Sequence, residues 1–227
     1  MLAALLTAGI TVQGQEVTIS WQNDAATVTV SDDILSLVKV KVSGADVSVE
    51  QDASVAQEIT YRLAGQSDNG SFVHKGDFKI TLSLEGLQLS SRTGTAMQIK
   101  NGKRIALVLK DGTENMLTDA ENGSQKGCMI VKGHSEFQGG GTLTINGRSK
   151  HAYKGDEYVE LKASLGTLNI NSTVKDGIHI DDYFEMKGGL LNNAVIRYQP
   201  DIFLDAVFRV GDWDSLHNIG SCRKQMK

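Results

Sequence analysis

Proline is almost absent from this chain, which has one proline and 24 glycines among 227 residues. Because proline removes ladder hydrogen bonds and glycine allows tight corners with positive φ, this balance favours stacked strands. The two cysteines, Cys128 and Cys222, are too few for a disulfide framework, and neither has metal-type Cys/His spacing. A net charge of −4 offers no basic surface of the kind that binds nucleic acid, so we expect no nucleic-acid partner.

The chain also lacks a hydrophobic run long enough to span a bilayer. Its first residues, Met1–Ile10, are apolar, and Val12-Gln13-Gly14 supplies the small residue of a secretory cleavage site. The basic leading segment is missing, so we interpret residues 1–14 as a truncated signal peptide; the alternative is a buried first strand. We therefore expect a secreted protein, located in the periplasm, on the cell surface or outside the cell.

The most informative stretch is a repeat between Gly141 and Gly188. Shifting Gly141–Ala163 forward by 25 residues onto Gly166–Gly188 aligns ten identical residues among 23 positions without a gap. A fixed period in the twenties is typical of a solenoid, in which each unit buries its apolar face against its neighbours.

Within each repeat unit the apolar residues recur at every second position, as in Leu143 and Ile145. This is a strand pattern, and no helical period separates the strands. We therefore predict an all-β fold, a single-stranded parallel β-helix with rungs of about 25 residues, over residues 15–193.

The two ends of this domain differ from its middle. Strand-like segments between Glu16 and Val49 are predicted to form its first rungs or a cap. After Asn193 the rhythm stops, and residues 194–227 form an atypical tail. Within it, Asp201–Val210 has the pattern of an amphipathic helix, which is either a cap or a product of truncation. We expect a monomer.

Several phrases in the sequence resemble a family of secreted bacterial proteins, common in gut Bacteroidetes, known as carbohydrate-binding domain-containing proteins. They are Ile59–Gly65, Asn101–Ile105, Lys110–Thr113, Lys132–His134, Lys150–Ala152 and Lys175–His179. The resemblance covers about residues 35 to 192 and implies a right-handed parallel β-helix similar in shape to pectate lyases. It also implies binding of polysaccharides, including acidic ones, with calcium in the fold. In family members, further rungs with an Asp-Gly-Ile motif follow. This chain departs from that pattern from Asn193 onward.

Stacking at a 25-residue period predicts a pair of acidic corners about 4.8 Å apart. Asp156 then lies over Asp181, and Glu157 over Asp182. Stacked carboxylates repel one another, and a calcium ion, which binds six to eight oxygens, would reverse that repulsion. We predict these four residues as calcium ligands; the alternative is that they point separately into water.

The same stacking predicts three outward columns: Tyr158 with Tyr183, Glu160 with Glu185, and Lys162 with Lys187. Phenols can contact sugar rings and lysines can pair with uronate carboxylates. The predicted carbohydrate-binding residues are Tyr158, Tyr183, Lys162, Lys187, Lys154 and His179. The alternative is an ordinary solvated face with weak Glu–Lys pairs.

A catalytic role is the competing interpretation of one part of this surface. Lys154 and His179 occupy equivalent positions beside His151 and Asp176, where a lyase would place a base near a calcium-bound uronate. No phosphate loop, serine-nucleophile motif or zinc-protease motif is present. We predict non-catalytic binding of an extended polysaccharide, foremost an acidic one, with a cellulosic glycan as the other partner. The alternatives are a calcium-dependent, pectate-type polysaccharide lyase and a structural or adhesive surface protein.

Overall fold

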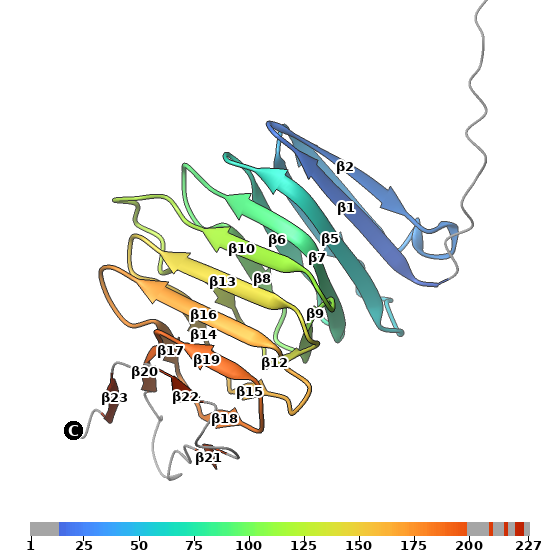
Figure 1. Cartoon of the computed structure of the whole chain (residues 1–227). Coiled ribbons are helices and arrows are strands. Elements are labelled where there is room, and N and C mark those ends of the chain that lie inside the picture. Colours follow the sequence, from blue (N-terminus) through green and yellow to red (C-terminus); the bar gives the residue numbers. More distant parts are fainter. Residues whose placement is uncertain (1–13, 199–208, 211–215, 218–220, 225–227) are drawn as a thin grey trace, which may run out of the picture.

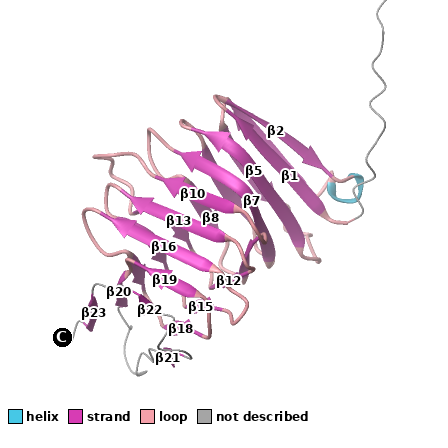
Figure 2. Cartoon of the chain, in the orientation of Figure 1, coloured by secondary structure: helices cyan, strands magenta, loops and turns pink. Residues whose placement is uncertain are grey.

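The computed structural model describes residues 14–198, 209–210, 216–217 and 221–224, which form strands almost throughout (Figures 1 and 2). The single short helix in these residues is the 3₁₀ turn η1 (Asp32–Ile34). In Figure 1 the strands wind around one axis and stack in successive turns, so the predicted all-β parallel solenoid is confirmed. No helix among these residues has the length and hydrophobicity needed to cross a membrane.

Three faces surround the solenoid axis. Face 1 is one sheet of parallel strands in the order β23-β20-β17-β14-β11-β8-β6-β4, to whose end β3 pairs antiparallel. Its strands are β3 (Val38–Ser43), β4 (Asp46–Gln51), β6 (Ser71–Lys75), β8 (Met97–Lys100), β11 (Gly127–Val131), β14 (His151–Gly155), β17 (Ile178–Ile180), β20 (Val195–Tyr198) and β23 (Ser221–Lys224).

Faces 2 and 3 belong to one bent sheet, because the long strands β5 (Ile59–Ser67) and β7 (Ile80–Ser90) run along both. The first half of β7 pairs with β9 on face 2, and its second half pairs with β10 on face 3. Face 2 continues through β9 (Ile105–Leu109), β12 (Ser135–Gln138), β15 (Val159–Leu161), β18 (Phe184–Met186) and β21 (Arg209–Val210). Face 3 continues through β10 (Glu114–Thr118), β13 (Thr142–Gly147), β16 (Thr167–Ser172), β19 (Leu190–Asn192) and β22 (Leu216–His217).

The register of the stack follows the repeat. Leu143 pairs with Leu168, and both are fully buried in a single hydrophobic core, as the alternating pattern predicted. The distance in sequence between stacked partners is not constant: it is 25 residues for Thr144 and Asn169, but 28 for Thr118 and Asn146. Corners of different length absorb these differences while the strands keep their pairing.

Antiparallel strands cover the N-terminal end of the solenoid. β1 (Glu16–Gln22) pairs antiparallel with β2 (Ala25–Val30) and parallel with β5, while β3 pairs antiparallel with β4. This arrangement protects the first open edge from pairing with other chains. The predicted first rungs or cap from Glu16 to Val49 are thus present.

Glycine is needed at one corner for a steric reason. Gly139 has φ +89°, and an added Cβ would lie 2.2 Å from the backbone oxygen of Leu109. The backbone segments of successive turns therefore lie too close together at this corner to leave room for a side chain.

Two predictions for the ends concern residues outside the described part. The predicted signal peptide covers residues 1–14, of which the structure describes only Gly14. The helix predicted for Asp201–Val210 lies outside it too, except that Arg209–Val210 form the strand β21. In the tail, Ile196 in β20 pairs with Ile178, and β23 pairs with β20. The domain boundary at residue 193 stays a prediction.

Candidate functional site

Most residues predicted to bind sugar or metal lie along the corner between faces 1 and 2, whereas Lys162 and Lys187 follow the face 2 strands β15 and β18. This corner connects β14 to β15 and, one turn further, β17 to β18. Lys154 pairs in register with His179, and the backbone N–H of Val159 donates to the carbonyl of Tyr183. The 25-residue repeat thus brings these residues together as predicted.

An aromatic stack runs along the edge of face 2. The rings of Tyr158 and Tyr183 lie 4.6 Å apart and are nearly parallel, with an interplanar angle of 5°. The ring of His134, from the preceding turn, stacks on the other side of Tyr158 at 4.5 Å and 12°. Neighbouring rings therefore cover both faces of Tyr158, so a sugar can reach its edge and hydroxyl group but not its face.

The two phenols in this stack remain uncharged near neutral pH. Burial, and then the charge of the neighbouring groups, raises the pKa of Tyr158 and of Tyr183 above the ordinary value. The stack thus presents a row of neutral hydroxyl groups that can donate or accept hydrogen bonds.

The predicted glutamate and lysine columns of face 2 form a connected set of ion pairs. Lys162 lies 3.2 Å from Glu136 and 2.7 Å from Glu160. Lys187 pairs with Glu160 and lies 3.4 Å from Glu185. Each lysine is therefore shared between two carboxylates, so neither is an unpaired cation.

Glu160 is the most enclosed member of this set, with 9% of its side chain exposed. Burial opposes its ionisation, but hydrogen bonds from Lys162 and Lys187 outweigh this and lower the pKa of Glu160 below its ordinary value. Glu160 is thus ionised at neutral pH, as the solvated-face alternative with Glu–Lys pairs also requires.

Between the two acidic corners lies the ammonium group of Lys154. Its Nζ is 2.6 Å from Asp181 Oδ2, 3.2 Å from Asp156 Oδ1 and 2.8 Å from the carbonyl oxygen of Gly155. This lysine is buried, although the sequence pattern placed it on the outside. Because the ammonium already offsets the repulsion between Asp156 and Asp181, that repulsion is a weaker argument for calcium here than the sequence suggested.

The other two predicted calcium ligands lie further out. Glu157 is 3.6 Å from the imidazole Nδ1 of His134, and Asp182 is exposed. Both carboxylates are accessible to solvent, and calcium binding by the four acids stays a prediction.

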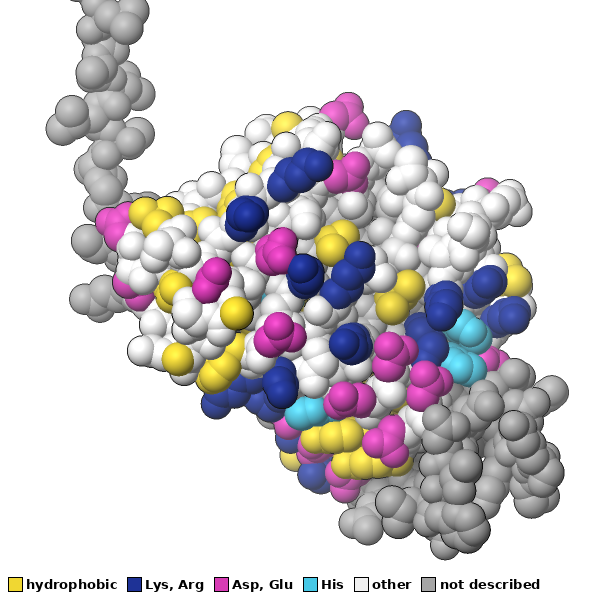
Figure 3. All heavy atoms as spheres, turned by 180° about the vertical axis from the view of Figure 1, so that it is seen from behind, with side chains coloured by type: hydrophobic (Ala, Val, Ile, Leu, Met, Phe, Trp, Pro, Cys, Tyr) yellow, Lys and Arg dark blue, Asp and Glu magenta, His cyan; other side chains and the backbone are white. Residues whose placement is uncertain are grey.

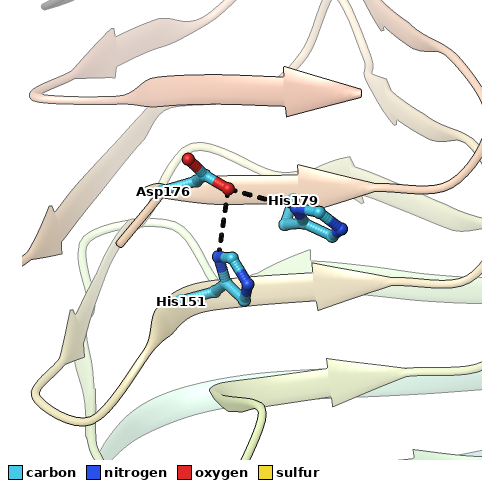
Figure 4. A group of neighbouring side chains, drawn as sticks. All are labelled: His151, Asp176 and His179. Atoms are coloured by element: carbon cyan, nitrogen blue, oxygen red, sulfur yellow. Dashed lines mark hydrogen bonds and ion pairs between the residues drawn. The ribbon is translucent and has the colours of Figure 1, made fainter. Parts of the chain in front are cut away.

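A compact group of three side chains lies on face 1, on or just before the strands that lead into this corner (Figure 4). His151 begins β14, Asp176 lies one turn further along the solenoid, and His179 belongs to β17. Asp176 Oδ2 is 3.3 Å from Nδ1 of His151 and 3.1 Å from Nδ1 of His179. Burial, followed by the effect of His179, lowers the pKa of His151 to about 4, so its imidazole is neutral at physiological pH.

The structure adds a column of lysines that the sequence repeat did not predict. Lys75 pairs in register with Lys100, and Lys132 directly follows Val131, the partner of Ile99. These lysines lie on consecutive turns of face 1, and Lys100 and Lys132 form no ion pair with any side chain in the described ranges. Figure 3 shows lysine and arginine side chains spread over this side of the molecule, with aspartate and glutamate side chains between them. We call Lys75, Lys100 and Lys132 the lysine column.

A groove with a volume of about 710 Å³ borders the lysine column. Its lining includes all three column lysines and Lys39, together with Glu50, Asp52 and Asp77. A count of lysines at the ends of the face 1 strands could have indicated this column. The 25-residue period does not predict it, because the sequence separation between Lys100 and Lys132 is longer than one period.

Face 3, by contrast, is almost uncharged. Asparagine side chains from successive turns form a hydrogen-bonded ladder, in which Asn171 donates to Asn146 at 2.9 Å and Asn192 donates to Asn169 at 2.8 Å. These amides satisfy one another, so the ladder stabilises the stack and leaves the charged chemistry to faces 1 and 2.

These observations define the class of the protein. It is a parallel β-solenoid whose outer faces carry regular ladders of polar, charged and aromatic side chains. The chain belongs to the family of carbohydrate-binding domain-containing proteins, which it matches over residues 46–195. A protein of this description from Acetivibrio thermocellus is 27% identical over 115 residues. The match covers 46% of this chain and 40% of that relative.

The fold has a close counterpart among solved structures. The polysaccharide lyase-like protein from C. thermocellum, solved as a gadolinium derivative, superposes with a TM-score of 0.69. It is 17% identical, and the match covers 86% of this chain and 79% of that chain. At this identity the likeness concerns the fold. The predicted family is confirmed, while the Bacteroidetes source, secretion, calcium and an acidic glycan stay predictions.

Proposed function

We propose that this protein binds an extended, acidic polysaccharide along face 1, parallel to the solenoid axis, without cleaving it. Membership of a carbohydrate-binding family supports a glycan as the ligand. The charge on face 1 favours an acidic glycan over a neutral one.

The lysine column is the observation that carries this proposal. Adjacent parallel strands lie about 4.8 Å apart, so Lys75, Lys100 and Lys132 form a row of cations at that spacing. Uronate carboxylates along a polysaccharide chain can pair with such a row, and each further contact strengthens binding through multivalency. Lys75 also pairs with Glu50 at 2.6 Å, so Lys100 and Lys132 are the stronger candidates for carboxylate contacts.

The face 2 residues predicted from the repeat have an accessory role in this proposal. Lys162 and Lys187 must leave their glutamate partners before they can pair with a glycan carboxylate. Tyr158 and Tyr183 offer their hydroxyl groups and ring edges. We assign these residues to the rim of the bound glycan.

Lyase activity is the second candidate, favoured by the Lys154 and His179 pair beside acidic groups. Lys154 argues against it, because its ammonium donates to Asp181 and to the Gly155 carbonyl and is therefore unavailable as a general base. A lyase would cleave polygalacturonate and release unsaturated uronides, and these products absorb ultraviolet light. We expect no such product.

Affinity electrophoresis through gels that contain polygalacturonate, or a neutral glycan as a comparison, tests the proposal directly. Wild type should be retarded by polygalacturonate. The variant Lys100→Ala with Lys132→Ala should lose most of that retardation. Lys162→Ala with Lys187→Ala, which removes the same charge from face 2, should lose less. Lys110→Ala with Lys126→Ala removes the same charge away from the lysine column, after β9 on face 2 and at the opposite end of β11, and should behave like wild type.

The outcomes separate the function classes. No retardation of wild type by any acidic or neutral glycan overturns glycan binding and favours the adhesive alternative. Retardation together with ultraviolet-absorbing product favours the lyase. Equal losses in the three double variants would show that net charge, not the lysine column, determines binding.

Secretion is part of the proposal and is tested separately. Mass spectrometry of the mature protein from its native host should show a chain that begins near Gly14. A mature chain that still begins at Met1 would argue against export.

A further inference from the structure

We propose that His151, Asp176 and His179 form a binding site for a divalent first-row transition-metal ion, with Zn²⁺ as the best fit. The argument for it needs neither glycan nor calcium, although His179 is also a predicted sugar-binding residue and Asp181, beside it, is a predicted calcium ligand. It requires only that three side chains on neighbouring turns keep the positions that the solenoid gives them (Figure 4).

The separation of the donor atoms is the first support for this site. Zinc binds imidazole nitrogen and carboxylate oxygen at 2.0–2.2 Å, so two ligands of a tetrahedral ion lie about 3.3–3.5 Å apart. Asp176 Oδ2 lies 3.3 Å from His151 Nδ1 and 3.1 Å from His179 Nδ1. All three donor atoms lie within 4.8 Å of one another, so small rotations of the side chains suffice to enclose an ion.

A second support is the orientation of His151. Its Nδ1 is buried and has no hydrogen-bond partner, even though the Asp176 carboxylate oxygen is only 3.3 Å away. A buried polar atom without a partner is costly. A metal ion between the imidazole and the carboxylate would supply the missing partner.

The surroundings of His179 provide a third support. The other nitrogen of this ring, Nε2, lies 3.6 Å from Asp181 Oδ1, and Asp181 is in turn held by Lys154. A carboxylate on the far nitrogen of a metal-binding histidine orients the ring and increases its basicity. Asp181 is in position to do this, with Nδ1 facing the metal.

The identity of the donors selects the type of ion. Two imidazoles and one carboxylate suit zinc and its neighbours in the first row, whereas calcium prefers oxygen ligands. Three protein ligands leave a fourth position for water or another oxygen ligand. His151 and His179 have 11% and 16% of their side chains exposed, so solvent can reach that position.

The competing interpretation is a hydrogen-bonded corner, in which both histidines simply donate to Asp176. It predicts that the three side chains stabilise the fold without any effect of added metal. The rings of His151 and His179 lie 4.4 Å apart at an angle of 30°, an arrangement that either interpretation allows. Metal titration therefore has to decide.

The test uses the full chain without an affinity tag, because a histidine tag itself binds zinc. Apo protein, prepared with a chelator, is titrated with ZnCl₂ in a calorimeter and, separately, with CoCl₂ while the visible spectrum is recorded. We expect one ion per chain and the intense visible bands of four-coordinate cobalt. Zinc should also raise the melting temperature.

Matched variants locate the site. His151→Gln, His179→Gln and Asp176→Asn should each reduce zinc affinity at least tenfold and weaken the cobalt bands. His134→Gln, which removes a histidine outside the cluster, should bind zinc like wild type. Circular dichroism of each variant confirms that it is folded.

Two results would overturn the proposal: no zinc binding by wild type, or equal affinity in wild type and in the folded cluster variants. Asp181→Asn gives a graded readout, because an orienting carboxylate should affect zinc affinity less than a ligand does. No glycan is present in these measurements, so a failure to bind zinc leaves the proposed polysaccharide binding intact. Equally, a failure to bind polysaccharide leaves the proposed zinc site intact.

Discussion

The phenol rings of Tyr158 and Tyr183 lie face to face, 4.6 Å apart, on successive turns of the solenoid. Their spacing is that of the strands that carry them, about 4.8 Å in a parallel sheet. The stack is therefore a direct consequence of the in-register repeat, and it stabilises the register that produces it.

Replacement of Tyr158 tests this contribution. Tyr158 contacts both His134 and Tyr183, and an aromatic pair contributes about 0.5–1.5 kcal/mol beyond buried area. Because the stack is partly exposed, we expect Tyr158→Ala to lower the free energy of unfolding by about 1–2 kcal/mol in urea denaturation. Tyr158→Phe keeps the ring and should cost much less. Equal losses in the two variants would show that the hydroxyl group, not stacking, stabilises the edge.

Acid should weaken the ion pairs around Glu160. The folded-state pKa of Glu160 is lower than its unfolded-state pKa, because hydrogen bonds from Lys162 and Lys187 outweigh burial. Its contribution to stability is thus fully present above the unfolded-state pKa, near 4.5, and is lost as the pH falls through the lower folded-state pKa.

The variant Glu160→Gln checks this pH dependence. It should be less stable than wild type by about 1 kcal/mol at pH 7. The difference should shrink as the pH falls below 4.5, in denaturant titrations at a series of pH values. Glu114→Gln, at an exposed site on face 3, is the control. A difference that does not change with pH would contradict the assignment.

Calcium binding at the acidic corners should depend on Lys154. The ammonium of Lys154 contacts Asp156 and Asp181, so a calcium ion has to displace it. We expect Lys154→Gln to increase the rise in melting temperature that calcium produces, and Asp156→Asn with Asp181→Asn to abolish that rise. If calcium changes the melting temperature of none of these proteins, the predicted calcium site is wrong.

Binding to polygalacturonate should weaken with salt. The lysine column is exposed, and charges at the surface are screened within about 8 Å at physiological ionic strength. Lys100→Ala with Lys132→Ala should lower the affinity about tenfold at low salt, since each exposed pair contributes up to about 1 kcal/mol. The difference in affinity between the variant and wild type should become smaller at high salt. An affinity that does not depend on salt would favour contacts other than the lysine column.

The corner glycines should differ sharply in their tolerance of alanine. Gly139→Ala meets both a positive φ and the Leu109 carbonyl at 2.2 Å, so we expect a loss of about 3 kcal/mol or more. Gly86 has φ +85° but nothing within 4 Å, so Gly86→Ala should cost about 1–2 kcal/mol. Gly94→Ala, with neither constraint, should be neutral. Thermal melting of the three variants separates backbone strain from steric clash.

Much of the fold could be predicted because the repeat determines which residues are neighbours. Parallel strands that stack in register place equivalent positions of successive units directly above one another. The ungapped period therefore predicted the pairs Leu143 with Leu168, Lys154 with His179, and Tyr158 with Tyr183, all of which the structure contains. The alternation of apolar residues similarly predicted the core.

Contacts between columns could not be predicted in this way, because they depend on side-chain rotamers and on the length of each corner. The period placed Lys154 above His179, but only the folded chain turns its ammonium toward Asp181. Where the corners differ in length, the period itself fails: His134 stacks on Tyr158 and Lys132 lies beside Lys100, although neither pair is 25 residues apart.

The sequence by itself thus determined the solenoid, its core and the columns within the exact repeat, since these follow from strand stacking and apolar alternation. Tertiary structure alone decided which lysines are paired, which remain available on face 1, and how His151, Asp176 and His179 meet across two turns. The physical reason is that backbone pairing fixes the position of each Cβ, whereas charges and ligand atoms at the ends of side chains are placed by three-dimensional packing.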